Sequence, residues 1–105
     1  MPQSRRRAHN EAVFRDVNER IATLGVAHRR RQLEIVCECA NLGCSQPIPL
    51  SLVEYEEARR DPRTFILARG HNDPQLEVVL ADRRAYLLVQ KTGDAAVEAV
   101  MTDPR

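Results

Sequence analysis

An apolar stripe at helical spacing marks the N-terminal third of the chain. Its members recur every three or four residues and are Val13, Phe14, Val17, Ile21 and Leu24. Polar residues fill the positions between them, so the pattern predicts an amphipathic helix whose stripe packs on the core. The helix is expected to begin near Asn10, a favourable N-cap, and to stop at Gly25. The stripe could also contact a partner.

A second helix is predicted downstream of Leu50. Ser51 and Glu54 have the spacing of a capping box, in which each side chain accepts a hydrogen bond from the other residue's amide. Asp61-Pro62 ends the helix, because proline cannot continue it. Leu52 and Tyr55 are then expected to face the core.

Short β-rich runs between turn residues predict an antiparallel sheet. They span residues 33–37, 65–68, 76–81 and 85–91. The last two flank Asp82-Arg83-Arg84 and predict a C-terminal hairpin, with a short helix over 76–81 as the alternative. The predicted fold class is therefore α+β: a small single domain with an N-terminal helix, a second helix and a short antiparallel sheet.

Composition limits the size of the core. Aromatic residues make up 4% of the 105 residues and there is no Trp, so few bulky side chains are available to fill the interior. Domains of this size bury a modest fraction of their surface, and they often need a metal or disulfides for stability.

The sequence gives no sign of a membrane or secretory protein. No run of about 18 apolar residues could form a transmembrane helix, and no apolar segment follows Arg5-Arg6-Arg7 as a secretory signal requires. We therefore expect a cytoplasmic protein, in which reducing conditions disfavour disulfides.

The three cysteines lie close together at Cys37, Cys39 and Cys44. Cys37 and Cys39 are two residues apart at the end of a predicted strand, so their side chains leave the same face. Asn41 and Gly43 supply the turn that returns Cys44 to them. Zinc prefers thiolate and imidazole ligands in a tetrahedron, so the cluster predicts a zinc site. Redox-active thiols and inert core thiols are the alternatives.

A fourth ligand has to come from another part of the chain. His71 is the preferred candidate, because it lies in a loop opened by Gly70 directly after a predicted strand; an ordinary surface histidine is the alternative. Asp73 could replace His71 or orient its ring. His9 and His28 are less suitable, since the first lies in a stretch without periodicity and the second in a basic linker.

The predicted site favours structure over catalysis. Four protein ligands make a structural zinc site, whereas three ligands and a water can be catalytic. Three thiolates leave a net charge of about −1 on the ion and its ligands, which reduces the Lewis acidity that hydrolytic zinc uses. The sequence also lacks a phosphate-binding loop, a nucleophile elbow and a zinc-protease motif. We therefore predict no enzyme activity.

Charge is unevenly distributed along the chain. Residues 1–31 carry eight Arg and three acidic residues, whereas residues 32–105 carry eight basic and twelve acidic residues. The runs Arg5-Arg6-Arg7 and Arg29-Arg30-Arg31 are typical of solvated surface, and they could also bind nucleic acid or an acidic protein. Glu38 is likewise expected to be solvated, because it alternates to the strand face opposite the cysteines.

The whole sequence resembles a family of small, functionally uncharacterised actinobacterial proteins. The resemblance rests on residues 10–21, Cys37-Glu38-Cys39 with Cys44, residues 50–56, Asp61-Pro62 with Phe65, Gly70-His71 and residues 102–105. It covers nearly the full length and is compatible with a shared metal site built on a CxC-x4-C…GH motif. It implies no activity.

These observations divide the chain into a disordered basic arm over residues 1–9, a zinc-binding α+β domain over residues 10–92 and a flexible tail over residues 93–105. The leading hypothesis is a non-catalytic, zinc-stabilised module that binds a cytoplasmic protein or nucleoprotein partner. A nucleic-acid-binding transcriptional regulator and a thiol-based redox sensor that releases zinc on oxidation are the alternatives.

Overall fold

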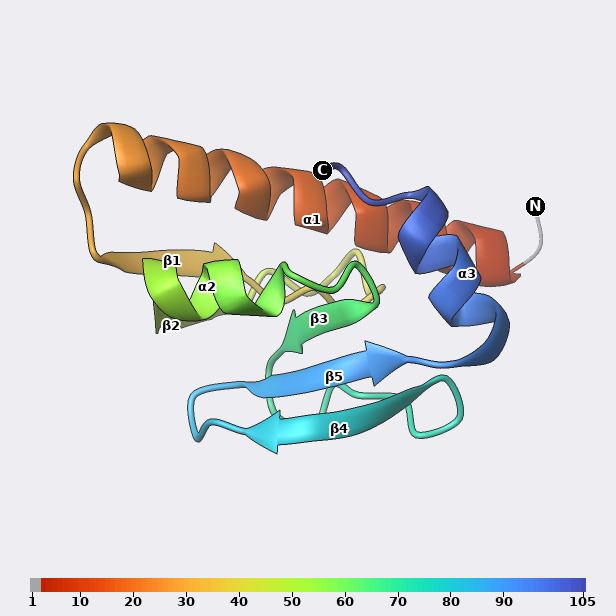
Figure 1. The fold of residues 1–105 in the computed structure, drawn as a ribbon. Coiled ribbons are helices and arrows are strands. Elements are labelled where there is room, and N and C mark those ends of the chain that lie inside the picture. Colours follow the sequence, from red (N-terminus) through yellow and green to blue (C-terminus); the bar gives the residue numbers. More distant parts are fainter. Residues whose placement is uncertain (1–2) are drawn as a thin grey trace.

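The computed structural model describes residues 3–105 of the chain, and side chains from residue 6 onward. The described residues form three helices and two antiparallel sheets, which confirms the predicted α+β class (Figure 1). In chain order the elements are α1 (Gln3–Ala27), β1 (Gln32–Val36), β2 (Pro47–Ser51), α2 (Leu52–Ala58), β3 (Thr64–Leu67), β4 (Glu77–Asp82), β5 (Leu87–Lys91) and α3 (Gly93–Met101).

The strands divide between two sheets rather than the single predicted one. β1 pairs with β2 in a two-stranded sheet, and the second sheet has the order β3-β5-β4. The β4–β5 hairpin confirms the prediction for this part of the chain, so the alternative of a short helix over residues 76–81 is wrong. Strand alternation directs Leu33 and Ile35 of β1 into the core, opposite Ile48 and Leu50 of β2.

Helix α2 has the predicted capping box. The Glu54 amide donates to Ser51 Oγ at 3.0 Å, and the Ser51 amide donates to Glu54 Oε1 at 2.8 Å. Two amides of the first turn are thereby satisfied, which fixes where the helix begins. Tyr55 is fully buried, as predicted for the inner face of this helix.

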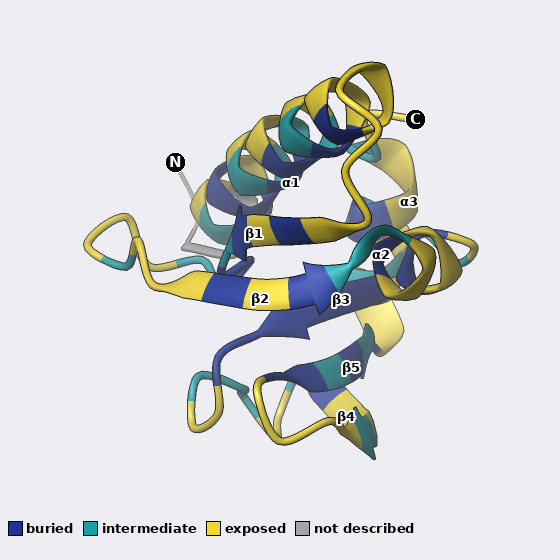
Figure 2. Cartoon of the chain, turned by 90° about the vertical axis from the view of Figure 1, so that its left-hand side faces the viewer, coloured by how far each residue is buried: buried dark blue, intermediate teal, exposed yellow. Residues whose placement is uncertain are grey.

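Helix α1 lies along β1 with its polar face inward (Figure 2). Glu11, Arg15 and Asn18 are buried, whereas 43% of Val13 and 59% of Leu24 are exposed. The prediction that the apolar stripe forms the core is therefore wrong. Only its margin, Phe14 and Ile21, is half-buried.

Partners from distant parts of the chain explain this orientation of α1. Lys91 Nζ forms an ion pair with Glu11 and lies 2.6 Å from Glu77 Oε2, and all three side chains are nearly inaccessible to solvent. Arg15 Nη2 lies 3.1 Å from Asp103 Oδ1. Buried charges are tolerated when they are paired in this way, so the partners on β4, β5 and the C-terminal segment decide which face of α1 turns inward.

Both ends of the chain differ from the predictions. α1 already begins at Gln3, so residues 3–9 of the predicted disordered arm are helical, and residues 1–2 lie outside the described part. The predicted flexible tail contains α3. This helix is held against α1 because Arg15 Nη1 donates to the Ala99 carbonyl at 3.2 Å.

Gly25 does not end α1 as predicted, but allows it to approach β1. A Cβ atom at this position would lie 2.6 Å from Leu33 Cδ2, so only glycine fits this contact without a shift of Leu33. The helix ends two residues later. Arg29 adopts a positive φ of 55°, and the Arg30 amide donates back to the Gly25 carbonyl at 2.8 Å, as in a Schellman cap.

Candidate metal centre

The candidate centre begins where β1 ends. The Cys37 amide donates to the Gln46 carbonyl at 3.0 Å, which extends the pairing of β1 with β2 by one residue. The next amide, that of Glu38, donates to the Ile66 carbonyl of β3 at 2.9 Å. The chain therefore crosses from one sheet to the other between these residues, and both Cys37 and Cys39 are buried at the crossing.

A tight turn returns Cys44 to the other two cysteines. The Cys44 amide donates to the Asn41 carbonyl at 2.9 Å, and the Gly43 amide donates to Asn41 Oδ1 at 2.9 Å. Asparagine favours such turns because its side chain bonds to the backbone two residues on. Cys44 is only half-buried, so it is the most accessible of the three thiols.

His71 reaches the cysteines through a turn that follows β3. Gly70 has a φ of 84°, which a side chain would disfavour, and the His71 amide donates to the Ala68 carbonyl at 3.1 Å. The ring then lies with Nδ1 3.5 Å from both Cys37 Sγ and Cys44 Sγ.

The structure brings together the four residues that the sequence predicts as ligands. One donor atom each from Cys37, Cys39, Cys44 and His71 lies within 4.8 Å of all the others. In a zinc tetrahedron with bonds of about 2.0–2.3 Å, neighbouring donors are roughly 3.5–3.8 Å apart, so small shifts suffice to surround an ion. Three sulfurs and one imidazole nitrogen are a donor set that zinc prefers.

The environment of the thiols couples metal binding to proton release. Burial raises the pKa of Cys37 to about 12 and also raises the pKa of Cys39, so without a cation both thiols are protonated at neutral pH. A divalent ion reverses this preference and displaces the protons. The Ala68 amide, 3.1 Å from Cys37 Sγ, is placed to stabilise the resulting thiolate.

The other candidate ligands lie elsewhere. His9 is exposed on α1 and His28 is exposed just after it, and neither belongs to the group of close donors. Asp73 is also outside this group, and its carboxylate lies 3.7 Å from Arg7 Nη1. The geometry therefore favours His71 over Asp73 as the fourth ligand.

Glu38 is not solvated, contrary to the prediction. It does point away from the two cysteines beside it, but α1 covers that face and the side chain is fully buried. Its carboxylate accepts from the Ile66 amide at 3.0 Å and from Asn18 Nδ2 at 2.8 Å. Burial raises its pKa. Glu38 thus ties the loop that bears the cysteines to β3 and α1.

Asn18 is the residue of this region that the sequence analysis missed. Its Nδ2 donates to the Val36 carbonyl and its Oδ1 accepts from the Val36 amide, both at 2.8 Å. The side chain therefore pairs with the end of β1 as a neighbouring strand would. A polar residue between the apolar positions of a helix normally indicates solvent exposure, so the sequence carried no signal for this role.

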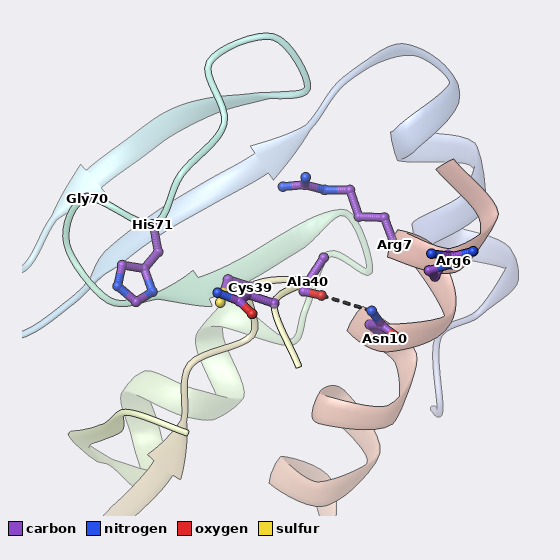
Figure 3. A pocket seen from close by; sticks show the side chains of 8 residues that line it. Arg6, Arg7, Asn10, Cys39, Ala40, Gly70 and His71 are labelled. Carbon is purple, nitrogen blue, oxygen red and sulfur yellow. Dashed lines mark hydrogen bonds between the residues drawn. The ribbon is translucent and has the colours of Figure 1, made fainter. Parts of the chain in front are cut away.

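A hollow of about 640 Å³ lies beside the centre, between its loops and the first turns of α1 (Figure 3). Cys39 and His71 line one side and Arg6 and Arg7 the other, with the Arg7 side chain extending toward the loop that carries His71. Asn10 Nδ2 donates to the Ala40 carbonyl at 2.9 Å and holds the helix to the cysteine loop. The side chain of Arg5 lies outside the described residues.

The two arginine runs do not form one basic surface. Arg29, Arg30 and Arg31 are exposed in the turn after α1. Arg6 and Arg7 lie near the opposite end of the helix, about 35 Å away at 1.5 Å per residue. A single nucleic-acid backbone would have to follow the whole length of α1 to contact both runs.

No helix in residues 3–105 combines the length and apolar character that a membrane span requires. Comparison of the chain with protein-family models, curated proteins and solved structures found no match. The resemblance to small actinobacterial proteins therefore stays a prediction.

Proposed function

We propose that the chain is a non-catalytic, zinc-stabilised interaction module that binds a cytoplasmic protein or nucleoprotein partner. The observation that carries the proposal is the convergence of Cys37, Cys39, Cys44 and His71, which provides four protein ligands for one ion. Four protein ligands close a tetrahedral site, as in structural zinc centres.

The position of the ligands supports a structural role. They come from the crossing between the two sheets, from the turn at Cys44 and from the turn after β3. An ion bound there adds a link between segments that are otherwise joined by backbone hydrogen bonds, by the Glu38 carboxylate and by core packing. The three thiolates also reduce the Lewis acidity of the ion, which disfavours activation of a water.

Exposed apolar side chains support a binding role. Most of them lie on three elements: α1, the edge strand β4 and α3. On these elements they are Val13, Val17, Leu24, Val26, Val78, Val79, Leu80, Val97, Val100 and Met101, whereas Leu42 and Val53 are exposed elsewhere. Soluble proteins rarely leave large contiguous apolar patches exposed unless they contact a partner.

The same geometry bears differently on the two alternative functions. Among the described side chains, Arg6 and Arg7 lie near one end of α1 and Arg29, Arg30 and Arg31 beyond the other, so they do not form one continuous basic surface for a nucleic-acid-binding regulator. The half-buried Cys44 is an accessible point at which oxidation could begin, and this favours the redox sensor as the second candidate.

Native mass spectrometry of the protein purified from its own organism tests the proposal. We expect one zinc ion per chain and a partner at fixed stoichiometry. Cys39→Ser should lose the ion, the helical signal and the partner. Leu42→Ser, an exposed position in the same loop, is the matched control and should keep all three. A well-folded wild-type protein without metal would contradict the proposal, as would partner binding by a metal-free Cys39→Ser variant.

A further inference from the structure

One side of α1 carries an apolar seam that the domain covers only in part. We define the α1 seam as Phe14, Val17, Ile21 and Leu24. The first and third residues are half-buried at its inner margin, whereas 38% of Val17 and 59% of Leu24 are exposed. The buried polar face of α1 forms its ion pairs within the domain, and exposed positions run along the outer side of the helix (Figure 2).

The spacing of the seam is that of a helix-pairing surface. Successive members are three, four and three residues apart, which is the heptad pattern of the a and d positions in paired helices. This spacing is symmetric, so it is the same from either end of the helix. An antiparallel copy of α1 therefore places Leu24 opposite Phe14 of the other chain and Ile21 opposite Val17.

Charges beside the seam fit the same arrangement. Asp16 and Arg20 lie near its centre, 3.2 Å apart and largely exposed. Two antiparallel copies would bring both pairs together near the two-fold axis, where each Arg20 could contact the Asp16 of the other chain. In the heptad of the seam Arg20 is at a flanking g position and Asp16 at the neighbouring c position, so this contact would lie at the margin of the interface.

A groove continues the seam toward β1. It has a volume of about 330 Å³, and its apolar lining includes Ile21, Leu24 and Leu33. In the antiparallel arrangement Phe14 of the second chain lies at this end of the seam, so the exposed part of its ring is placed to contact the groove.

We propose that the α1 seam is a dimer interface whose occupant is a second copy of this chain, docked antiparallel about a two-fold axis near the middle of α1. A two-fold interface requires a self-complementary surface, and the symmetric spacing of the seam supplies one. The inference names a protein partner for the proposed interaction module and rests on that function.

Sedimentation of the zinc-loaded full chain, from low micromolar to near-millimolar concentration, tests the dimer. We expect reversible dimerisation by the wild type. Val17→Glu and Leu24→Glu should each raise the dissociation constant at least about tenfold, because they bury an unpaired charge. Val53→Glu makes the same change at an exposed position of α2 and should leave dimerisation unchanged. A wild type that is monomeric throughout, or equal effects of all three variants, would overturn the inference.

The direction of docking is tested on the unmodified sequence, which avoids reliance on variants that fail to fold. In a mixture of isotope-labelled and unlabelled chains, filtered NOE spectra should show contacts between the Leu24 methyls and the Phe14 ring of the other chain. Contacts from Leu24 to Leu24 would indicate a parallel pair and overturn the antiparallel arrangement. Zinc content is measured in the same samples, so a metal-loaded monomer contradicts only the dimer, whereas a metal-free folded chain contradicts the proposed function.

Discussion

At the residue scale, the side chains of the candidate centre fall into two groups: those placed to bind an ion and those that hold the loops that present them. His71 is the only donor of the group outside the cysteine loop, and Gly70 gives it the turn that it needs. Asn18 and Glu38 do not belong to the group of donors. Asn18 bonds to the Val36 backbone directly before Cys37, and the Glu38 carboxylate accepts from the Ile66 amide of β3. Loss of a donor and loss of a supporting residue should therefore have different consequences.

Replacement of His71 by Ala should weaken zinc binding by more than the roughly 10- to 100-fold that loss of an outer-shell partner costs. Three thiolates remain, so binding should not be abolished. Competition with a chromophoric chelator measures the affinity. His28→Ala removes an exposed histidine outside the group and should leave it unchanged. Full affinity in His71→Ala would show that another residue is the fourth ligand.

Replacement of Asn18 by Ala should lower the free energy of unfolding by about 2–3 kcal/mol, since it removes the side-chain partner of the Val36 amide, the Val36 carbonyl and Glu38 Oε2. Urea unfolding of the zinc-loaded protein measures this change. Asn72→Ala, at a half-buried loop position, is the control. A loss below about 0.5 kcal/mol would mean that water replaces Asn18 and that the helix does not depend on it.

At the element scale, α1 is positioned by charge pairing rather than by its apolar stripe. The inner side of the helix presents Glu11 to Lys91 and Arg15 to Asp103, which are 80 and 88 residues away in sequence. The sequence predicts the wrong inward face for α1 because these partners lie so far away in the chain. Periodicity shows which face of a helix is apolar, but it does not show whether the opposite face will find partners for its charges.

Replacement of Lys91 by Met should lower the free energy of unfolding by about 3–5 kcal/mol at neutral pH, because it leaves Glu11 and Glu77 buried together without the ammonium group that pairs with both. Burial already raises the pKa of Glu11, and loss of Lys91 would raise it further. A carboxyl with a raised pKa favours the folded state when protonated and loses that contribution as the pH rises. The defect should therefore shrink as the pH falls toward 5.

Urea unfolding between pH 5 and pH 7 measures the Lys91→Met defect, with Arg60→Met at an exposed position as the control. Addition of Glu77→Gln to Lys91→Met should restore part of the lost stability, since one buried charge is removed. An equal defect at both ends of this pH range would contradict the pairing as the cause.

The sequence predicts those features correctly that are determined by residues close together in the chain. The capping box of Ser51 and Glu54 and the hairpin of β4 and β5 involve residues close in sequence, and both are present. The N-terminal turns of α1 and the whole of α3 were missed. α3 is anchored by Arg15 through Ala99 and Asp103, and no local pattern reveals a contact with a residue so far away in the chain.

At the scale of the whole molecule, the candidate centre lies where the two sheets meet. The residue types were sufficient to select its members: three clustered cysteines and a histidine after a glycine. The sequence did not reveal that the crossing at Cys37 and Glu38 joins β1 to β3, because this depends on backbone pairing across the fold. The ion would therefore stabilise the arrangement of the sheets as well as the cysteine loop.

Removal of zinc should unfold the domain rather than loosen one loop. Zinc binding to small structural sites contributes on the order of 10 kcal/mol, which is comparable to the whole stability of a typical domain. Without the ion, Cys37 and Cys39 remain as protonated thiols, and α1 loses the fixed β1 end to which Asn18 bonds.

Chelation should abolish the helical circular dichroism and the dispersion of amide NMR signals, and added zinc should restore both. The thermal midpoint should rise with free zinc, because only the folded chain presents the complete ligand set. If the chelated protein kept native amide dispersion, the paired charges between α1, β5 and the C-terminal segment would be sufficient to hold the fold, and the ion would serve the cysteine loop alone.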